Sequence, residues 1–334
     1  MSDLKLKMAC KLYDRTLPFF LGWVKPRGIE LEMVDITEGR PKPEGVPAGH
    51  TGHMHAGLVD MSEHSASVYL VMKEMGCDFT SIPVFPHRRF RHAYIYVHKN
   101  AGITGPKDLE GRRVGVPRLA NTAALWARGA LMHVYDVDYD KVNWVPFSSE
   151  YAEGMDTPRD VNLAEVVTNK TEVEALRDRE IDAYISPSES EEAFDPDSFV
   201  GRLFPNFIEV EKEYFRQTKI FPIMHGFVLR DSLIREEPWV VESMMEAWQQ
   251  AIDLTYRFIR DQRKSCLVWF GDYWRQEREF FGDWDPWKMD FQHNYHILDA
   301  LCQYGHEQRL VQRRFKPEEI FITGPIEGAK SPAS

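Results

Sequence analysis

The sequence predicts an α/β fold of two lobes with a ligand cleft between them. Segments with strand-like alternation are followed by segments with helical spacing along most of the 334 residues, which is typical of mostly parallel sheets. This alternation breaks near residue 95, restarts as a second unit, and returns near residue 223 in a part that ends in long helical patterns. We therefore predict one lobe from residues 1–95 and 223–334, and a second lobe, 96–222, inserted into it.

The first part of the chain opens with two strand signals. Apolar and polar residues alternate at 4–9 and at 28–34, as in half-buried strands. Residues 38–51 are rich in Gly and Pro and predict a loop, whereas residues 65–75 carry apolar side chains at helical spacing. Further strands are expected at 58–63, 82–85 and 94–97.

The second unit and the returning part repeat the alternation. Strands are expected near 113–117 and at 143–146, 181–185 and 221–229. Helices are expected at 122–135, 171–179, 209–217, 238–258, 263–274 and 294–308. The chain is expected to cross between the lobes at 93–98 and 220–229. Because ligands of open α/β sheets bind beyond the carboxyl ends of the strands, the crossings place the expected site between the lobes.

Composition argues against several classes of protein. The net charge of −11 disfavours a nucleic-acid partner, which would select a basic surface. No segment approaches the roughly 18–20 apolar residues of a membrane span, and the first residues lack the apolar region of a signal peptide. The widely spaced cysteines predict neither a disulfide framework nor a thiolate zinc site. We expect a cytoplasmic protein with no membrane or nucleic-acid partner, and a homo-oligomer stays open.

The densest basic cluster of this acidic chain lies between two expected strands, at residues 87–92. Arginine pairs with carboxylates through two parallel hydrogen bonds, so Arg89 and Arg91 are candidates for binding a planar aromatic acid. His92 is a candidate for proton transfer. The alternative is a solvated loop that balances nearby acidic residues.

A polar run follows the strand expected at 58–63. Glu63 and His64 are neighbours at the expected carboxyl end of that strand, where an acid/base pair is useful, and Ser62 adjoins them. Capping of the next helix explains the serines equally well. His225 lies on the expected crossing strand, where it is a proton-transfer candidate or a satisfied core histidine.

The start of the helix at 122–135 is a further candidate. Thr122 is placed to cap it, and the N–H groups of a helix start attract anions. Trp126 and Arg128 follow on the same helix, and the alternative is an ordinary cap with Trp126 in the core. Arg15, in the polar loop after the first strand, is a further substrate-binding candidate, together with Ser62, His64 and these residues of the helix.

Three histidines in the Gly-rich loop, His50, His53 and His55, do not have the spacing of a known metal motif. We interpret this segment as a loop or a lid. The sequence also contains no Walker loop and no GxGxxG. No organic cofactor is expected and no metal-ligating residue is assigned, although a divalent metal held by His and Glu stays open.

Several motifs in order along nearly the whole chain resemble the bacterial 4,5-dihydroxyphthalate decarboxylase family. The specific ones are residues 82–86 with Arg89-Phe90-Arg91-His92, and Ile220-Phe221-Pro222-Ile223-Met224-His225. Others lie at 108–117, 122–129, 180–183, 203–205, 213–215 and 304–308. The stretch 108–117 is shared by many proteins of the type-2 periplasmic-binding-protein-like fold, so it is less specific.

The resemblance implies that two-lobed fold and a carboxy-lyase activity. The expected reaction converts 4,5-dihydroxyphthalate to protocatechuate and CO2, in the breakdown of phthalate and other aromatic compounds. Arg89, Arg91 and Arg128 would hold carboxylate, whereas His92, Glu63 and His225 would transfer the proton. A non-catalytic cytoplasmic protein that binds an aromatic acid, like a solute-binding protein, is the alternative, and an enzyme acting on another aromatic acid is a third.

Overall fold

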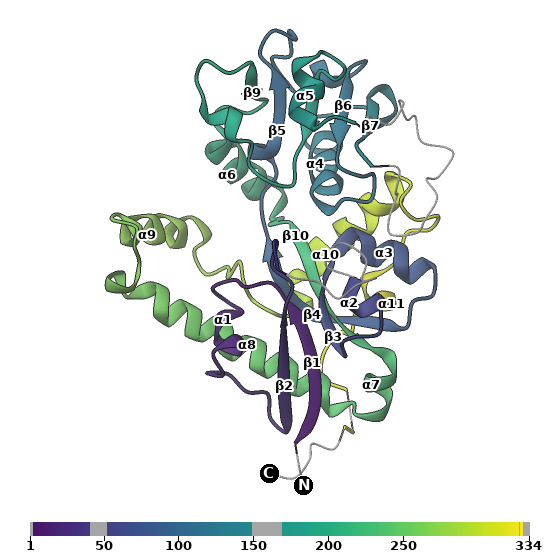
Figure 1. Ribbon diagram of the computed structural model, residues 1–334, viewed down its shortest axis with the longest axis vertical. Helices are drawn as coiled ribbons and strands as arrows, with labels where there is room; N and C mark the ends of the chain where they lie inside the picture. The colour runs from purple at the N-terminus through teal and green to yellow at the C-terminus, as the bar shows by residue number, and fades with distance from the viewer. Residues whose placement is uncertain (1–2, 41–51, 149–168, 327, 330–334) are drawn as a thin grey trace.

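The computed structural model describes residues 3–40, 52–148, 169–326 and 328–329. Two five-stranded sheets occupy the two halves of an elongated molecule (Figure 1). The first sheet has the order β2 (Ile29–Asp35), β1 (Leu4–Cys10), β3 (Met61–Ser65), β10 (Ile223–Arg230) and β4 (Phe79–Arg88). The second has the order β7 (Asn143–Pro146), β6 (Arg113–Val116), β8 (Ala183–Ile185), β5 (Ile95–His98) and β9 (Val200–Arg202).

The first sheet is parallel except for one returning strand. β1 runs parallel to both β2 and β3, whereas β10 is antiparallel to its neighbours β3 and β4. The alternation of β1 explains its register, because Lys5 and Lys7 lie opposite Glu30 and Glu32 while Leu6 and Met8 are buried. β10 is buried along nearly its whole length, as expected for a central strand.

The second sheet has the same plan in a smaller form. β6 is parallel to β7 and β8, and β5 is antiparallel to β8 and β9. The chain enters this half through a short 3₁₀ turn, η1 (His92–Tyr94), that joins β4 to β5. The predicted two-lobed α/β architecture is therefore confirmed. The lobe boundaries at 95/96 and 222/223 stay a prediction.

Helices cover the sheets and extend to one side. They are α1 (Leu17–Phe20), α2 (Gly52–His55), α3 (Ala66–Glu74), α4 (Thr122–His133), α5 (Glu172–Arg177), α6 (Phe207–Thr218), α7 (Asp231–Glu236), α8 (Trp239–Arg260), α9 (Phe270–Phe281), α10 (Phe291–Glu307) and α11 (Pro317–Ile320). The remaining 3₁₀ turns are η2 (Pro106–Leu109), η3 (Tyr139–Lys141), η4 (Glu191–Phe194) and η5 (Gln262–Lys264). None of the helices in the described residues combines the length and hydrophobicity needed to cross a membrane.

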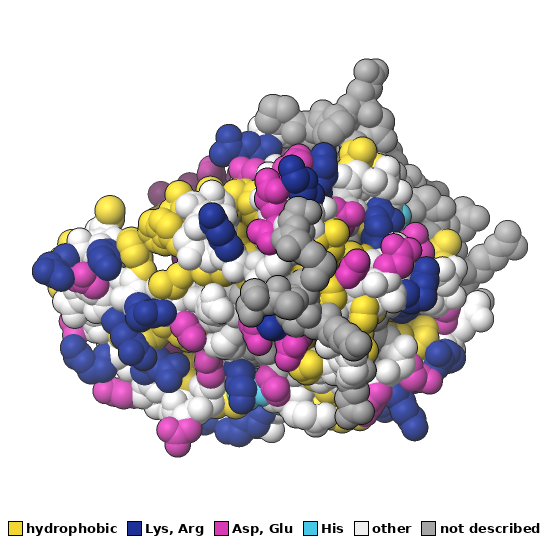
Figure 2. All heavy atoms as spheres, turned by 90° about the horizontal axis from the view of Figure 1, so that it is seen from below, with side chains coloured by type: hydrophobic (Ala, Val, Ile, Leu, Met, Phe, Trp, Pro, Cys, Tyr) yellow, Lys and Arg dark blue, Asp and Glu magenta, His cyan; other side chains and the backbone are white. Residues whose placement is uncertain are grey.

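Helix α8 shows why the amphipathic patterns were informative. Its buried residues recur three or four positions apart, and Trp248 packs on Phe19 of α1 and Phe227 of β10 with ring centroids 5.0 and 5.3 Å away. Helices α8 and α9 project together beside the first sheet (Figure 1). The lower surface of the molecule is shown in Figure 2. Acidic and basic side chains are interspersed over its described part, and hydrophobic side chains gather toward the α9 side.

Some predicted elements have shifted boundaries, and two of them have a clear physical reason. The helix expected at 263–274 begins only at Phe270, because Ser265 Oγ accepts from the Leu267 N–H and holds that segment in a turn. The strand expected at 58–63 lies at Met61–Ser65, because its pairing with β10 continues to Ser65. The polar run therefore belongs to the strand itself.

Helices α4 and α10 are joined by close packing. Gly129 of α4 faces Tyr304 of α10, and a Cβ at Gly129 would lie 2.2 Å from the tyrosine ring. Only glycine allows the two helices to approach so closely at this point. Arg128, next to Gly129, crosses the same contact to Gln308.

Candidate functional site

Three neighbouring strands of the first sheet bring Glu63, His87 and His225 together. His225 of β10 lies opposite His87 of β4 on one side and Ser65 of β3 on the other. Glu63, two residues before Ser65, therefore lies diagonally across from His225 on the same face. Register shifts in the β10–β4 pairing on both sides of His225 mark an irregularity of the kind that often adjoins active sites.

Glu63 contacts His225, Tyr13 and Lys11. Its side chain is fully buried, and His225 Nδ1 donates to Oε1. The Tyr13 hydroxyl also donates to Oε1, at 2.7 Å, and the Lys11 backbone N–H donates to Oε2 at 3.0 Å. Tyr13 and Lys11 lie just after β1, which runs parallel to β3, so both strands deliver these residues to the same edge of the sheet.

The two imidazoles are held neutral at ordinary pH. Burial, with the nearby His225, lowers the pKa of His87 to about 2. Burial also lowers the pKa of His225 well below its usual value, and the nearby cations Lys11 and Arg15 add to the effect. His87 forms the more exposed edge of the cluster, since it is half-buried whereas Glu63 and His225 are buried. A neutral imidazole can accept a proton or bind a metal.

Arg15 places a cation beside the cluster. Its guanidinium lies between the rings of Tyr13 and Trp287, 4.2 and 4.3 Å from their centroids. Nε donates to the Pro86 carbonyl, and Nη1 pairs with Asp14 at 2.8 Å. Arg15 also lines a cavity of about 210 Å³ whose wall includes Trp287 and residues of α8 and α9. This sequence-predicted substrate-binding residue is therefore next to Glu63 and His225, two of the predicted proton-transfer residues.

Thr122 lies near the cluster but does not cap its helix. The N-cap is Asn121, whose side chain accepts from the Ala124 N–H, so the expected cap was one residue off. Thr122 Oγ1 instead contacts Ser65 Oγ at 2.7 Å and accepts from the Ser67 N–H at 3.1 Å. These bonds tie the start of α4 to the start of α3, directly beside the residue that pairs with His225.

His64 and Ser62 alternate with Glu63 and therefore face the other side of β3. His64 is fully buried against Phe79, Tyr69 and His55, and burial lowers its pKa to about 3. The Ser62 hydroxyl donates to the Glu63 carbonyl. Because Glu63 and His64 face opposite sides of β3, the expected acid/base pair of these two neighbours does not form. Glu63 contacts His225 instead. His53 and His55 lie in and around this packing on α2, whereas His50 is outside the described residues.

The basic segment 87–92 is divided among three environments. His87 joins the cluster, whereas Arg88 points to the core and donates to Asn294 Oδ1 at 2.5 Å. Arg91 donates to the Ser186 carbonyl and lies over the Tyr94 ring. Arg89 is exposed and lies 5.4 Å from the same ring.

His92 turns into an aromatic core of the second half. Its ring packs against Tyr135, Phe204 and Tyr214, and burial lowers its pKa to about 4. The described contacts of His92, Arg89 and Arg91 are thus in the second half, away from the partners of Glu63. The structure does not bring these three residues together with Glu63 and His225.

Trp126 and Arg128 are packed inside the protein. Trp126 Nε1 donates to the Ile223 carbonyl at 2.8 Å, which fixes α4 against β10. Arg128 is fully buried, and its guanidinium donates to Gln308 Oε1 and to the Leu119 carbonyl. These contacts give both side chains a structural explanation.

Sequence reasoning did not assign Tyr13 or His87 to the surroundings of Glu63. Tyr13 follows β1 at the same sheet edge as Glu63, and the parallel pairing of the two strands is the signal that points to it. His87 was considered only as part of the basic segment. Neighbouring residues of a strand point to opposite faces, so His87 reaches the cluster whereas Arg88 points to the core.

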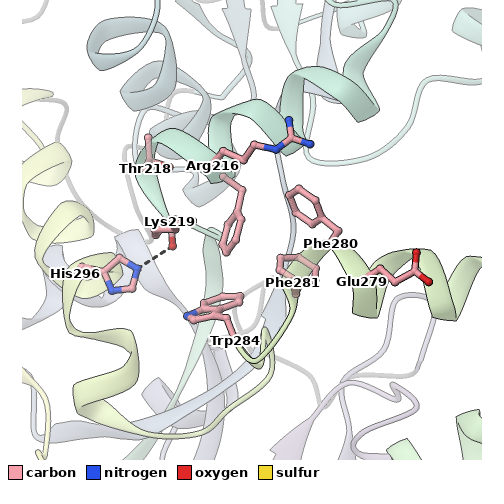
Figure 3. Close-up of a pocket in the computed structure, with 9 residues that line it drawn as sticks. Arg216, Thr218, Lys219, Glu279, Phe280, Phe281, Trp284 and His296 are labelled. Carbon is pink, nitrogen blue, oxygen red and sulfur yellow. Dashed lines mark hydrogen bonds between the residues drawn. The ribbon is translucent and has the colours of Figure 1, made fainter.

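A larger cavity lies between α6 and the α9–α10 region (Figure 3). It has a volume of about 840 Å³, and its wall is formed mainly by the rings of Phe215, Phe280, Phe281 and Trp284. His296 Nε2 donates to the Lys219 carbonyl at its edge. None of the predicted site residues lines it. The Glu63 cluster, with its touching carboxylate and imidazole, is therefore the better candidate for chemistry.

Comparisons with known proteins agree with this architecture. The NMT1/THI5-like family matches residues 21–157. A solved structure of the periplasmic aliphatic sulphonate-binding protein SsuA from Escherichia coli is similar with a TM-score of 0.55 and 14% identity, covering 100% of this chain and 96% of that one. This likeness confirms the predicted fold of the periplasmic binding proteins.

Curated relatives carry the family assignment. A 4,5-dihydroxyphthalate decarboxylase of Pseudomonas putida is 31% identical over 193 residues, covering 56% of this chain and 72% of the relative. The enzyme of the same description from Comamonas testosteroni is 30% identical over 339 residues, covering 99% of this chain and 100% of the relative. The chain therefore belongs to the 4,5-dihydroxyphthalate decarboxylase family.

Proposed function

We propose that this protein converts 4,5-dihydroxyphthalate to protocatechuate and CO2 at the Glu63 cluster. The observation that carries the proposal is the full-length relationship to the Comamonas testosteroni decarboxylase. It is supported by the buried contact between Glu63 and His225, which a protein that only binds an aromatic acid does not need.

The chemistry makes three demands on the protein. A ring hydroxyl para to the departing carboxylate donates electrons when it loses its proton. The ring carbon then takes up one proton, its bond to the carboxylate carbon breaks, and aromaticity is restored as CO2 leaves. The protein must accept the hydroxyl proton and supply one proton to the ring carbon, hold the carboxylate end, and keep the charges out of bulk water.

The Glu63 cluster and Arg15 are suited to the two ends of this substrate. The neutral imidazole of His225, oriented by Glu63, can accept the hydroxyl proton. Arg15 lies beyond Tyr13, where its guanidinium can pair with a carboxylate. Tyr13 touches both groups, through its ring and its hydroxyl. The substrate would thus lie along Tyr13, with its diol at Glu63 and its carboxylates at Arg15.

The direct test is an assay for CO2 and protocatechuate. Purified full-length protein is expected to release one CO2 for each 4,5-dihydroxyphthalate consumed, with loss of the substrate spectrum. Phthalate, which lacks the hydroxyl groups, should bind without releasing CO2. Binding of the dihydroxy acid with no CO2 from it, or from related hydroxybenzoates, would instead support a non-catalytic binding protein.

Replacement of Arg15 by glutamine is expected to raise KM about 20-fold and to change kcat much less. The reason is that a charged hydrogen bond to a carboxylate contributes about 1.5–3 kcal/mol to binding. Steady-state kinetics on 4,5-dihydroxyphthalate measure this. Arg27→Gln is the matched control, because Arg27 is half-exposed and pairs with Glu242 and Glu246 at the surface. Equal KM values for the two variants would show that Arg15 does not bind the substrate carboxylates.

A further inference from the structure

We propose that Glu63, His87 and His225 bind a divalent transition-metal cation, and that the vicinal hydroxyl groups of the aromatic substrate complete its coordination. The metal site is argued from the three side chains alone. The diol ligand rests on the proposed function. The sequence spacing gave no sign of this site, since its residues come from three separate strands.

The positions of the donor atoms fit such a site. One ligand atom from each residue lies within 4.8 Å of one from each of the others. A transition metal with bonds of about 2.0–2.2 Å holds neighbouring ligands roughly 3–4 Å apart, so side-chain shifts on the order of 1 Å close the site. The three residues lie on adjacent strands, which makes the backbone beneath them rigid.

His87 supplies an independent observation. Its Nδ1 is buried and has no hydrogen-bond partner within the described residues. Buried polar atoms of folded proteins are nearly always satisfied, and an ion is one of the groups that satisfies them. His87 is also the half-buried member of the cluster, so a ligand can approach the cation from its side.

The composition of the cluster selects the class of cation. Two imidazoles and one carboxylate on one side of a metal are typical of sites for iron, zinc and similar ions that keep positions open for a substrate. Calcium and magnesium prefer oxygen ligands throughout. Hydrogen bonds from the Tyr13 hydroxyl and the Lys11 backbone N–H orient the Glu63 carboxylate, as outer partners of metal ligands commonly do.

Two cations near the cluster, Lys11 and Arg15, disfavour further positive charge there, but each has an acidic partner of its own. Lys11 Nζ forms an ion pair with Glu38, and Arg15 forms one with Asp14. These ion pairs partly offset the positive charges closest to the cluster. The Glu63 carboxylate contacts His225 and Tyr13, and its negative charge is the one that remains for a bound ion.

An aromatic diol is a natural partner for the open positions. Its two adjacent oxygens bind one metal together, and a cation makes the hydroxyl protons easier to remove. This strengthens the electron donation that decarboxylation requires. With the cation bound, His225 is a ligand, and the hydroxyl protons pass to water when the diol binds. The overall balance is unchanged: one C–C bond breaks, one C–H bond forms with one proton, and no oxidant or reductant takes part.

The first experiment measures metal binding without reference to activity. Full-length protein freed of metal with EDTA is titrated with Zn²⁺ by calorimetry and with Co²⁺ by visible absorption. We expect one high-affinity ion per chain and a thermal midpoint about 5 °C higher at 100 times Kd. Glu63→Gln and His87→Asn should each weaken binding at least about 100-fold.

The control is a surface pair of the same residue types. His133 Nε2 contacts Glu307 Oε2 at 2.6 Å, and both side chains are partly exposed. His133→Gln should leave the high-affinity site unchanged. Circular dichroism shows whether each variant is folded. If Glu63→Gln does not fold, His87→Asn alone tests the metal site. Absence of a high-affinity ion in the wild type, or equal affinity in all folded variants, would overturn the metal site.

The second experiment separates the metal site from the proposed function. Addition of protocatechuate to the Co²⁺ protein should change its visible spectrum, whereas phthalate, without a diol, should not. An equal response to phthalate would overturn the diol assignment. Full decarboxylation by metal-free protein would show that the cation has no part in the reaction. A bound ion with no CO2 from any hydroxylated acid would reject the proposed function and leave the metal site standing.

Discussion

Glutamine in place of Glu63 is expected to lower kcat for decarboxylation by about 10³-fold. The variant keeps the shape of the side chain but loses its negative charge. It therefore cannot orient a proton-accepting His225 or hold a cation, and its amide group cannot accept from both Tyr13 and Lys11 in the same way. Single-turnover measurements of CO2 release at saturating substrate test this effect on the chemical step.

Glu307→Gln is the matched control for this prediction. It makes the same chemical change in a Glu–His pair that is partly exposed, and kcat should stay within twofold of the wild type. A Glu63→Gln enzyme with kcat within tenfold of the wild type would place the chemistry elsewhere in the protein.

Replacement of Gln308 by leucine is expected to lower the free energy of unfolding by about 3 kcal/mol. Gln308 is fully buried, accepts from Arg128 Nε at 2.8 Å, and donates to the Leu125 carbonyl at 2.9 Å. Leucine removes an acceptor from a buried cation, which is among the more costly changes in a protein interior. Denaturant unfolding measures the loss, and the thermal midpoint should fall by about 5 °C.

A double-mutant cycle shows whether the buried charge is the cause. Arg128→Met combined with Gln308→Leu should be less destabilised than the sum of the two single changes, because the stranded cation is gone. Gln217→Leu, on the exposed face of α6, should change stability by less than about 0.5 kcal/mol. If Gln308→Leu raised KM and left stability unchanged, the result would support a role for Arg128 in substrate binding.

The sequence predicted the architecture more completely than the site. Periodicity placed α4, α8 and β10 within a few residues, because each of these elements buries one face or both against neighbours. Glu63 and His225 were also identified, each from its place on an expected strand. Their direct contact spans 162 residues and depends on β10 lying beside β3, which no local pattern encodes.

The surroundings of charged residues were the hardest feature to predict from local sequence. Arg128 looked like a ligand-binding group on a helix start, yet its partner Gln308 lies 180 residues further along and holds it in the interior. In the basic segment, strand alternation places Arg88 in the core, where it donates to Asn294, and places His87 beside Glu63. Local sequence shows that such residues are close together in the chain, but tertiary packing decides which of them meet.

Because β10 comes late in the sequence, the first sheet can be completed only late in synthesis. β3 and β4 both pair with β10, so their facing edges have no partner in the first sheet until Ile223–Arg230 has left the ribosome. Every strand of the second sheet lies between Ile95 and Arg202 and is available earlier. Unpaired strand edges are prone to aggregation, so the nascent chain passes through a vulnerable stage that lasts until its return strand inserts. Since Glu63, His87 and His225 each sit on one of those three strands, the same insertion that closes the sheet also assembles the cluster.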